Sequence, residues 1–364
     1  MADIRPCRTD DLEHVVRLFL RAFRKGSSHS VPAATDYFQR LYFANPWADD
    51  ALPSLVAEGA DGIMGFIGVV PLPVRVDGVT FRVAVGGNLM VDPEVHDPMV
   101  AARLLRRYFA GPQDLAFTDT ANEHALRLWA SLGGRVGRFP SMRWVLPLRA
   151  GALGLAGVRR ATSSRVLAAL GRAVVWPVDR LGRGRLLPAA PALTVHEVAP
   201  AAIQEFSAAV GDRGYAHPDV DAVGFQWLID MCRQKQQFGP LRLVRFADGD
   251  GRTSGVAAYY PNEAGLGQVV LLQARDGAHA DVLDALALDA AAHGSAALVG
   301  QADPRLMVAL GARASTYVQR NEFVTVLPGR SPEAAAAATR LAAGDVSMSR
   351  LVGEWWTRMQ GDVF

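Results

Sequence analysis

The predicted order of secondary structure constrains this chain most, because one order of strands and helices occurs twice. Each copy contains a strand, two helices, several antiparallel strands, a helix, a strand, a helix and a final strand. The first copy runs from Ile4 to Leu146 and the second from Leu193 to Leu327. We therefore expect an α/β (α+β) protein of two similar domains, each a mixed, mostly antiparallel twisted sheet flanked by helices.

The final strand of each copy is expected to pair within the sheet of that same copy. The first closes with a strand at Val136–Leu146, interrupted near Pro140, and the second with a strand at Tyr317–Leu327. Within the first copy, apolar residues recur at helical spacing over Leu12–Phe23, which predicts a helix. Asp77-Gly78 is typical of a hairpin turn. The repeated unit is thus predicted to be a complete domain.

The chain divides into four segments on this prediction. They are an N-terminal domain at 1–149, an Arg-rich helical linker at 150–192, a C-terminal domain at 193–330 and a helical tail at 331–364. The linker carries seven arginines and a single acid, Asp179. We favour a solvated inter-domain helix; the alternatives are a surface for RNA or a helix that lies on a membrane.

The totals limit the classes of function. Basic and acidic residues nearly balance at 38 and 36, so the net charge requires no nucleic-acid partner. Cys7 and Cys232 are too few and too far apart for a metal cluster, and no motif for a metal or nucleotide occurs. The chain lacks a signal-peptide pattern and an apolar run of about 20 residues. We expect a cytoplasmic protein without metal or stable membrane insertion.

Four stretches of the first copy carry a resemblance. They are Ile4–Phe23; Val56-Ala57-Glu58 leading to Gly65–Gly68; Gly87–Glu94; and Asn122–Trp129 followed by Leu132-Gly133. In this order and spacing they resemble the GNAT superfamily of N-acyltransferases, over about residues 3–148. For residues 193–330 only the order of elements supports the resemblance, which is closest to bacterial tandem proteins with two GNAT-like halves.

The resemblance implies a cleft where the fourth and fifth strands separate and pair with the amides of a pantetheine arm. It assigns cofactor contacts to a set that runs from the fourth strand to the fourth helix: Leu89, Met90, Val91, His96, Asp97, Met99, Val100, Ala101, Asn122 and Trp129. It also implies that a backbone amide at Met90 or Val91 stabilises the oxyanion. Glu58 and Asp119 are general-base candidates, and Asn88 is expected to orient substrate or water.

Two departures from the family concern the donor site. The phosphate loop, which is rich in glycine in the family, reads here His96-Asp97-Pro98-Met99-Val100-Ala101, and only Ala101 fits the pattern. Pro98 has no N–H to donate, and Asp97 places a negative charge where a phosphate would lie. Trp129 replaces the tyrosine that protonates the leaving thiolate in many members, so that role is lost unless Tyr108 or another residue takes it.

Three functions follow. The first is N-acyl transfer to a small-molecule amine from acetyl-CoA, another acyl-CoA or an acyl-carrier protein. The second is aminoacyl transfer from charged tRNA, because tandem GNAT-like halves without a coenzyme A loop resemble Fem-type transferases. The third is a non-catalytic binding protein; the loss of the family's glycine and tyrosine positions is the argument for it. Of the three we prefer the acyltransferase, since the fourth-strand and fourth-helix motifs are present.

Overall fold

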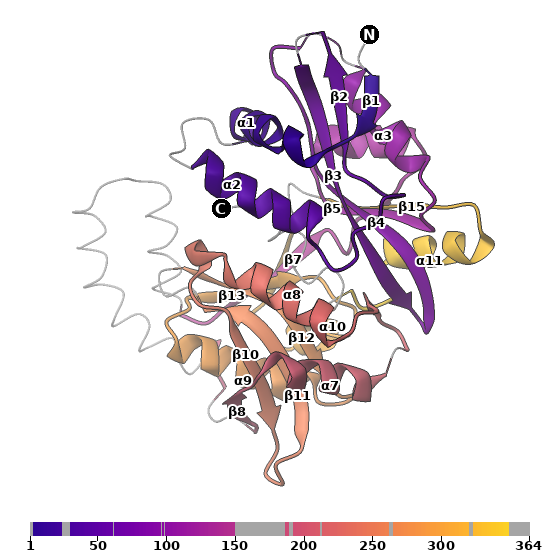
Figure 1. Ribbon diagram of the computed structural model, residues 1–364. Coiled ribbons are helices and arrows are strands. Elements are labelled where there is room, and N and C mark those ends of the chain that lie inside the picture. Colours follow the sequence, from indigo (N-terminus) through magenta and orange to yellow (C-terminus); the bar gives the residue numbers. More distant parts are fainter. Residues whose placement is uncertain are drawn as a thin grey trace. The chain divides into compact units, whose positions relative to one another are not determined.

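The computed structural model of the protein describes residues 3–23, 30–60, 62–95, 97, 99–149, 186–188, 192–211, 213–261, 265–319 and 323–348 (Figure 1). All seven linker arginines, and the helical tail beyond residue 348, lie outside the described residues. Internal contacts divide the chain into two compact units. Unit 1 comprises residues 1–141, 212–234 and 320–364, and unit 2 comprises residues 142–211 and 235–319.

Unit 1 is built on a sheet that mixes the two ends of the chain. Its strand order is β1 (Asp3–Pro6), β2 (Leu55–Gly59), β3 (Gly62–Val76), β4 (Val79–Val91), β5 (Leu115–Ala121), β15 (Phe323–Pro328) and β6 (Arg135–Gly137). Among the described strands of this sheet, only β4 and β5 pair in parallel, and the short β9 (Ala216–Pro218) pairs with the far end of β3. The long β3–β4 hairpin turns at Asp77-Gly78, as predicted, with both residues at positive φ.

Helices cover both faces of this sheet, as alternate residues of β3 show. Gly65 and Ile67 face α3 (Val100–Phe109), because both lie against its apolar side chains. Phe66 packs on the last residue of α2 (Val31–Phe38), and Gly68 lies against Tyr42, just after this helix. The helix α1 (Leu12–Phe23) packs against α2, and α4 (Glu123–Ser131) packs against α3. One face therefore carries α1 and α2, and the other carries α3 and α4.

The remaining elements of unit 1 are short or peripheral. They are the 3-10 turn η1 (Thr9–Asp11), the π-helical turn η2 (Gln39–Phe43), α8 (Ala222–Arg233) and α11 (Pro332–Ala343). The helix α11 packs on β15 and β6. Cys7 is buried, and burial raises the pKa of its thiol to about 12, so it is an inert core residue.

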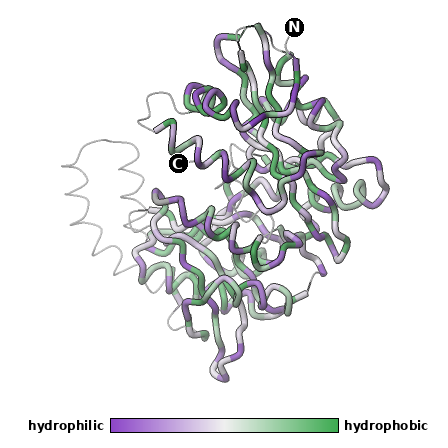
Figure 2. Tube along the Cα trace, in the orientation of Figure 1, coloured by the Kyte–Doolittle hydropathy of each residue, from purple (hydrophilic) through white to green (hydrophobic). Residues whose placement is uncertain are grey.

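Unit 2 repeats the architecture. Its strand order is β14 (Thr316–Gln319), β7 (Met142–Pro147), β13 (Ala297–Gln301), β12 (Leu266–Ala274), β11 (Thr253–Tyr260), β10 (Arg242–Ala247) and β8 (Thr194–Glu197). Again a single pair, β12 with β13, is parallel. The helical elements are α7 (Pro200–Val210), η3 (Gln236–Phe238), α9 (His279–Ala292) and α10 (Met307–Gly311). Figure 2 shows hydrophobic residues along the strands and hydrophilic residues at the tip of the β10–β11 hairpin.

The predicted fold class is confirmed: each unit is a mixed, mostly antiparallel sheet flanked by helices. The prediction that each copy closes its own sheet was wrong. The segment at Val136–Leu146 is two strands, β6 in the first sheet and β7 in the second. The segment at Tyr317–Leu327 is likewise divided between β14 and β15, so the two copies exchange a strand. Pro140 and the buried Ser141, whose side-chain oxygen accepts from the Val324 N–H, lie at the first crossing.

Candidate functional site

The first sheet opens between its two parallel strands. The pairing of β4 with β5 covers only Val83–Val85 and Leu115–Phe117, after which the strands separate. Beyond that point β5 pairs with β15 on its other edge, at Thr118 and Ala121. The gap leaves the inner edges of β4 and β5 without each other as hydrogen-bonding partners, which a buried backbone tolerates only when another group takes the place.

A β-bulge lies at the opening. Gly68 on β3 faces Gly87, and two residues earlier Phe66 faces Met90, so β4 contains one residue more than β3 over this interval. The extra length falls at Asn88 and Leu89, and Asn88 has a φ of 50°, in the left-handed region that asparagine tolerates better than most residues. The bulge turns the Asn88 side chain toward the opening.

A pocket of about 250 Å³ occupies the opening. Its lining combines aromatic and aliphatic side chains, two glycines and four neutral polar residues. The residues are Phe19, Phe23, Ile67, Gly86, Gly87, Asn88, Leu89, Thr118, Thr120, Ala121, Asn122, Ala125 and Trp129. Phe19 and Phe23 come from α1, on one face of the sheet, and Ala125 and Trp129 come from α4, on the other. The pocket therefore reaches both faces through the sheet.

Asn88 is held by a buried tyrosine. Its Nδ2 donates a hydrogen bond of 2.8 Å to the hydroxyl of Tyr42, which lies in the π-helical turn after α2. Burial raises the pKa of Tyr42, and the hydroxyl therefore stays protonated at neutral pH. Gly68 makes room for this ring, because a Cβ there would meet the Tyr42 hydroxyl. The sequence prediction did not include Tyr42, since nothing in the local pattern marks a π-helical turn.

The α4 side of the pocket is built from residues with structural partners. Trp129 is buried and packs edge-on against Tyr108 and Phe109, with ring centroids 5.9 Å and 4.8 Å apart. The Asn122 side chain caps α4 by accepting from the Ala125 N–H at 3.0 Å. Both residues also line the pocket, as does Leu89. The Tyr108 hydroxyl, which the sequence offered as a substitute acid, is buried and donates to the Ala84 carbonyl at 2.6 Å.

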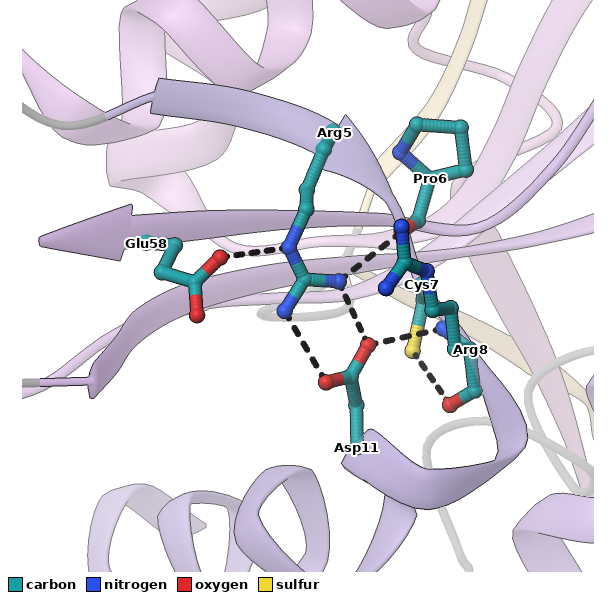
Figure 3. A network of polar contacts seen from close by, with 6 residues as sticks. All are labelled: Arg5, Pro6, Cys7, Arg8, Asp11 and Glu58. Atoms are coloured by element: carbon teal, nitrogen blue, oxygen red, sulfur yellow. Dashed lines mark hydrogen bonds and ion pairs between the residues drawn. The ribbon is translucent and has the colours of Figure 1, made fainter.

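The two predicted carboxylate bases do not line the pocket. Glu58 lies on β2 and accepts from the Arg5 Nε at 2.5 Å, and this contact lowers the pKa of the Glu58 carboxyl. Figure 3 shows Arg5 between Glu58 and Asp11, to which its guanidinium also donates. Asp119 is buried on β5 between Thr118 and Thr120; strand alternation directs it to the face opposite these two pocket residues.

The loop before α3 is held by the carboxylate of Asp97. The Met99 N–H donates to Asp97 at 2.9 Å, and Arg103 donates to the other carboxyl oxygen of Asp97 at 2.5 Å. The hydrogen bond from Arg103 lowers the pKa of the Asp97 carboxyl, which stays ionised. The α-helix begins at Val100, and Met99 at its N-cap position makes no side-chain cap hydrogen bond. His96 and Pro98 lie outside the described residues.

The other cofactor residues named by the resemblance are close in sequence to the pocket but do not line it. They are Met90, Val91, Asp97, Met99, Val100 and Ala101. Met90 is buried, and Val100 packs in the cluster between α3 and the sheet. The bulge residues and the fourth helix thus meet at the pocket, whereas the predicted phosphate loop does not reach its lining.

Unit 2 contains a similar opening. The strands β12 and β13 pair only over Leu266–Gln268 and Ala297–Val299, and the register of β11 with β12 shifts between Ala258 and Tyr259. At the end of β12, Arg275 donates through Nε to the Thr253 carbonyl at 2.8 Å and lies over the Phe206 ring. The Arg275 guanidinium therefore has partners within unit 2.

Comparison with solved structures gives many matches to one fold. A probable N-acyltransferase from Enterococcus faecalis matches with a TM-score of 0.58 and 10% identity, covering 90% of this chain and 73% of that one. A GCN5-related N-acetyltransferase from Anabaena variabilis matches with a TM-score of 0.58 and 10% identity, covering 90% and 72%. The protein has the GNAT fold. No family model matches the sequence, and no curated protein matches it either.

A third solved structure matches less well. Saccharomyces cerevisiae N-myristoyltransferase with bound myristoyl-CoA and inhibitors matches with a TM-score of 0.50 and 10% identity, covering 89% of this chain and 79% of that one. In the described part of this GNAT-fold chain, no group of three or more His, Cys, Asp or Glu side chains is placed to hold a metal ion. None of its described helices is both long and apolar enough to cross a bilayer.

Proposed function

We propose that this protein is an N-acyltransferase that moves an acyl group from a thioester to an amine. The observation that carries the proposal is the pocket in unit 1, which lies at the opening between β4 and β5 of a GNAT fold and reaches both faces of the sheet. A pocket of this form lets a donor enter from one face and an acceptor from the other. The reacting atoms would then meet at the bulge.

The chemistry follows from the groups at the bulge. The amine nitrogen attacks the thioester carbonyl carbon, the C–S bond breaks, and the proton lost by the nitrogen goes to the leaving thiolate. Backbone N–H groups on β4 at Met90 or Val91 would stabilise the oxyanion, as the resemblance implies. Asn88, fixed by Tyr42, would orient the acceptor through its amide. Among the described residues, no titratable side chain lines the pocket, so positioning carries most of the rate enhancement.

The capped loop favours a donor that does not depend on a pyrophosphate contact at α3. A phosphate would need to bind at the loop before α3. There the Asp97 carboxylate already accepts hydrogen bonds from the Met99 N–H and from Arg103. Because the Asp97 carboxyl is ionised, it would repel a phosphate group placed beside it. We therefore propose that pantetheine presented by an acyl-carrier protein, or a coenzyme A held by its pantetheine arm, supplies the acyl group. The tRNA-dependent alternative rests on the Arg-rich linker, outside the described residues.

The test is thiol release from S-acetylpantetheine and acetyl-CoA in the presence of a panel of small amines. Ala125→Phe would fill the pocket from α4, and we expect it to lower the rate by at least tenfold. Ala130→Phe is the matched control, because Ala130 is exposed on the same helix and does not line the pocket. A wild-type protein that releases no thiol with any amine would contradict the proposal, as would equal rates in the two variants.

A further inference from the structure

The helix that follows the opened strand of unit 1 is strongly basic. The ten residues of α3, Val100–Phe109, include three arginines and no acidic residue. Arg106 and Arg107 are exposed in its last turn, and no described side chain forms an ion pair with either of them. Arg103, one turn earlier, pairs with Asp97 at 2.5 Å. The exposed side of α3 therefore carries positive charge that the described part of the chain does not neutralise.

The equivalent helix of unit 2 has the opposite charge. The helix α9, His279–Ala292, likewise follows the strand that separates from its parallel neighbour, here β12. It contains three aspartates and neither lysine nor arginine. Two of these aspartates are paired, Asp284 with Arg313 at 2.6 Å and Asp289 with Arg242 at 3.4 Å. The abundance of arginine in the chain as a whole thus does not explain the basic α3, because the same position in the second copy has none.

The basic helix lies on the same face of the sheet as one side of the pocket. The pocket reaches this face through Ala125 and Trp129 of α4. Trp129 packs edge-on against Phe109 of α3, with ring centroids 4.8 Å apart, so the two helices are in direct contact there. On α4, Arg127 adds a further exposed cation, which is loosely paired with Glu123 at 4.0 Å. A partner that binds α3 would therefore lie next to this side of the pocket.

We infer that the exposed side of α3 is the docking surface for the protein that delivers the acyl group, an acidic acyl-carrier protein. The inference rests on the proposed function and narrows its donor from two candidates to one. A carrier protein bears its pantetheine arm on a single phosphodiester and lacks the adenosine part of coenzyme A. Acidic side chains of the carrier, and not a pyrophosphate, then supply the charge that is recognised. Complementary charge at the edge of an interface raises the rate of association and fixes the orientation of the partners.

The experiment compares two donors, acetylated holo-acyl-carrier protein and S-acetylpantetheine, with an amine that the wild type accepts. Arg106→Glu/Arg107→Glu reverses both exposed charges of the last turn of α3. We expect kcat/KM to fall at least about tenfold with the carrier protein and to stay within about twofold with S-acetylpantetheine, which has no protein surface to dock. Arg106→Lys/Arg107→Lys keeps the charge and should retain at least about half of the activity with the carrier.

The control for net charge is Arg17→Glu/Arg40→Glu. Both arginines are exposed in unit 1, on the helical segments of the opposite face of the sheet. This variant changes the net charge by the same amount, and we expect it to lower the activity with the carrier far less than the α3 variant does. An equal loss in the two double variants would indicate a general charge effect and would overturn the inference. An equal loss with both donors, or no loss with the carrier, would overturn it as well.

The choice of donor separates the failure of this inference from the failure of the proposed function. A wild type that uses acetyl-CoA or S-acetylpantetheine but not the carrier protein would overturn the inference and leave the proposed function standing. Thiol release from none of the three donors would contradict both. A gel shift with uncharged tRNA at about 50 mM salt tests the remaining partner. If the wild type binds tRNA and Arg106→Glu/Arg107→Glu does not, α3 is a surface for RNA phosphates, and the inference is overturned.

Discussion

At the scale of single residues, the site depends on a few unusual placements. Asn88 adopts a left-handed backbone conformation, and its side-chain amide donates a hydrogen bond to the buried Tyr42, which is distant in sequence. Glycine at 68 accommodates that ring. Asn88 was predictable as a candidate from its place in the fourth-strand motif, whereas Tyr42, Phe19 and Phe23 were not. Phe19 and Phe23 line the pocket, and Tyr42 bonds Asn88 behind it, only because α1 and the π-helical turn pack on the same face of the sheet.

The backbone at Asn88 gives a stability prediction. Both Asn88→Ala and Asn88→Gly lose the hydrogen bond to Tyr42, but only glycine adopts a φ of 50° without steric cost. We expect the alanine variant to be less stable than the glycine variant by about 1 kcal/mol. Thermal unfolding of the two proteins measures the difference. An alanine variant at least as stable as the glycine variant would show that the bulge relaxes.

The Arg5 network gives a prediction for pH. Arg5 donates two hydrogen bonds to Asp11, at 2.6 Å and 2.9 Å, and this contact holds the pKa of the Asp11 carboxyl below its usual value. A depressed pKa contributes stability above the unfolded pKa near 4, and this is lost as the pH falls through the folded pKa. We expect Asp11→Asn to be less stable than wild type by about 1 kcal/mol at pH 6, with the gap closing below pH 4.

The measurement is the melting temperature of both proteins from pH 6 to pH 3. Glu13→Gln is the control, since Glu13 is exposed and pairs with Arg17 along one helix turn. A gap between wild type and Asp11→Asn that stays constant across this range would mean that Asp11 contributes through packing and not through its charge.

At the scale of elements, the local sequence pattern decides where helices and strands form, whereas tertiary contacts decide which sheet a strand joins. The amphipathic helix α1 forms over the stretch whose apolar residues recur at helical spacing, because that spacing is strong and continuous. The hydrogen bond from the Met99 N–H to the Asp97 carboxylate is likewise local, because the two residues are two positions apart in the sequence. The closing strands were not predicted correctly. Sequence pattern marks β6, β7, β14 and β15 as strands, but it holds no information on which sheet each one joins.

The cap on α3 yields a prediction for donor binding. In the wild type, coenzyme A should bind no more tightly than pantetheine, because Asp97 opposes the pyrophosphate. Asp97→Asn keeps an acceptor for the Met99 N–H, removes the charge and releases Arg103. We expect the ratio of coenzyme A affinity to pantetheine affinity to rise about fivefold in this variant.

Calorimetric titration of both ligands measures that ratio. Glu94→Gln removes an equal charge from an exposed position of the same loop, and we expect it to leave the ratio unchanged. A wild-type protein that already binds coenzyme A far more tightly than pantetheine would show that a phosphate site exists elsewhere on the chain.

At the scale of the whole molecule, the exchanged strands make each sheet depend on both copies of the repeat. Between β5 and β6 lies β15, made by residues 323–328, and between β13 and β14 lies β7, made by residues 142–147. The division into domains at 1–149 and 193–330 follows the repeat along the chain, whereas the compact units follow the exchange. Sequence repeats show duplication, but they do not show how the final strands are distributed.

The exchange predicts the behaviour of fragments. A fragment of residues 1–149 lacks β15, so the far edge of β5 and the core under α4 are exposed. We expect this fragment, and the fragment 150–364, to show no cooperative thermal unfolding when each is made alone. Co-expression should give a 1:1 complex that melts cooperatively, measured by circular dichroism after gel filtration. A cooperative melt of fragment 1–149 alone would contradict this.

The position of β15 also has a consequence during synthesis. The ribosome makes residues 1–141 first, yet the strand that completes their sheet is made only after the residues of unit 2. At an elongation rate of about 5–20 residues per second, the open edge of β5 stays unpaired for roughly 10–40 s. During that interval the nascent chain presents an unpaired strand edge, and it is a natural client for a ribosome-associated chaperone.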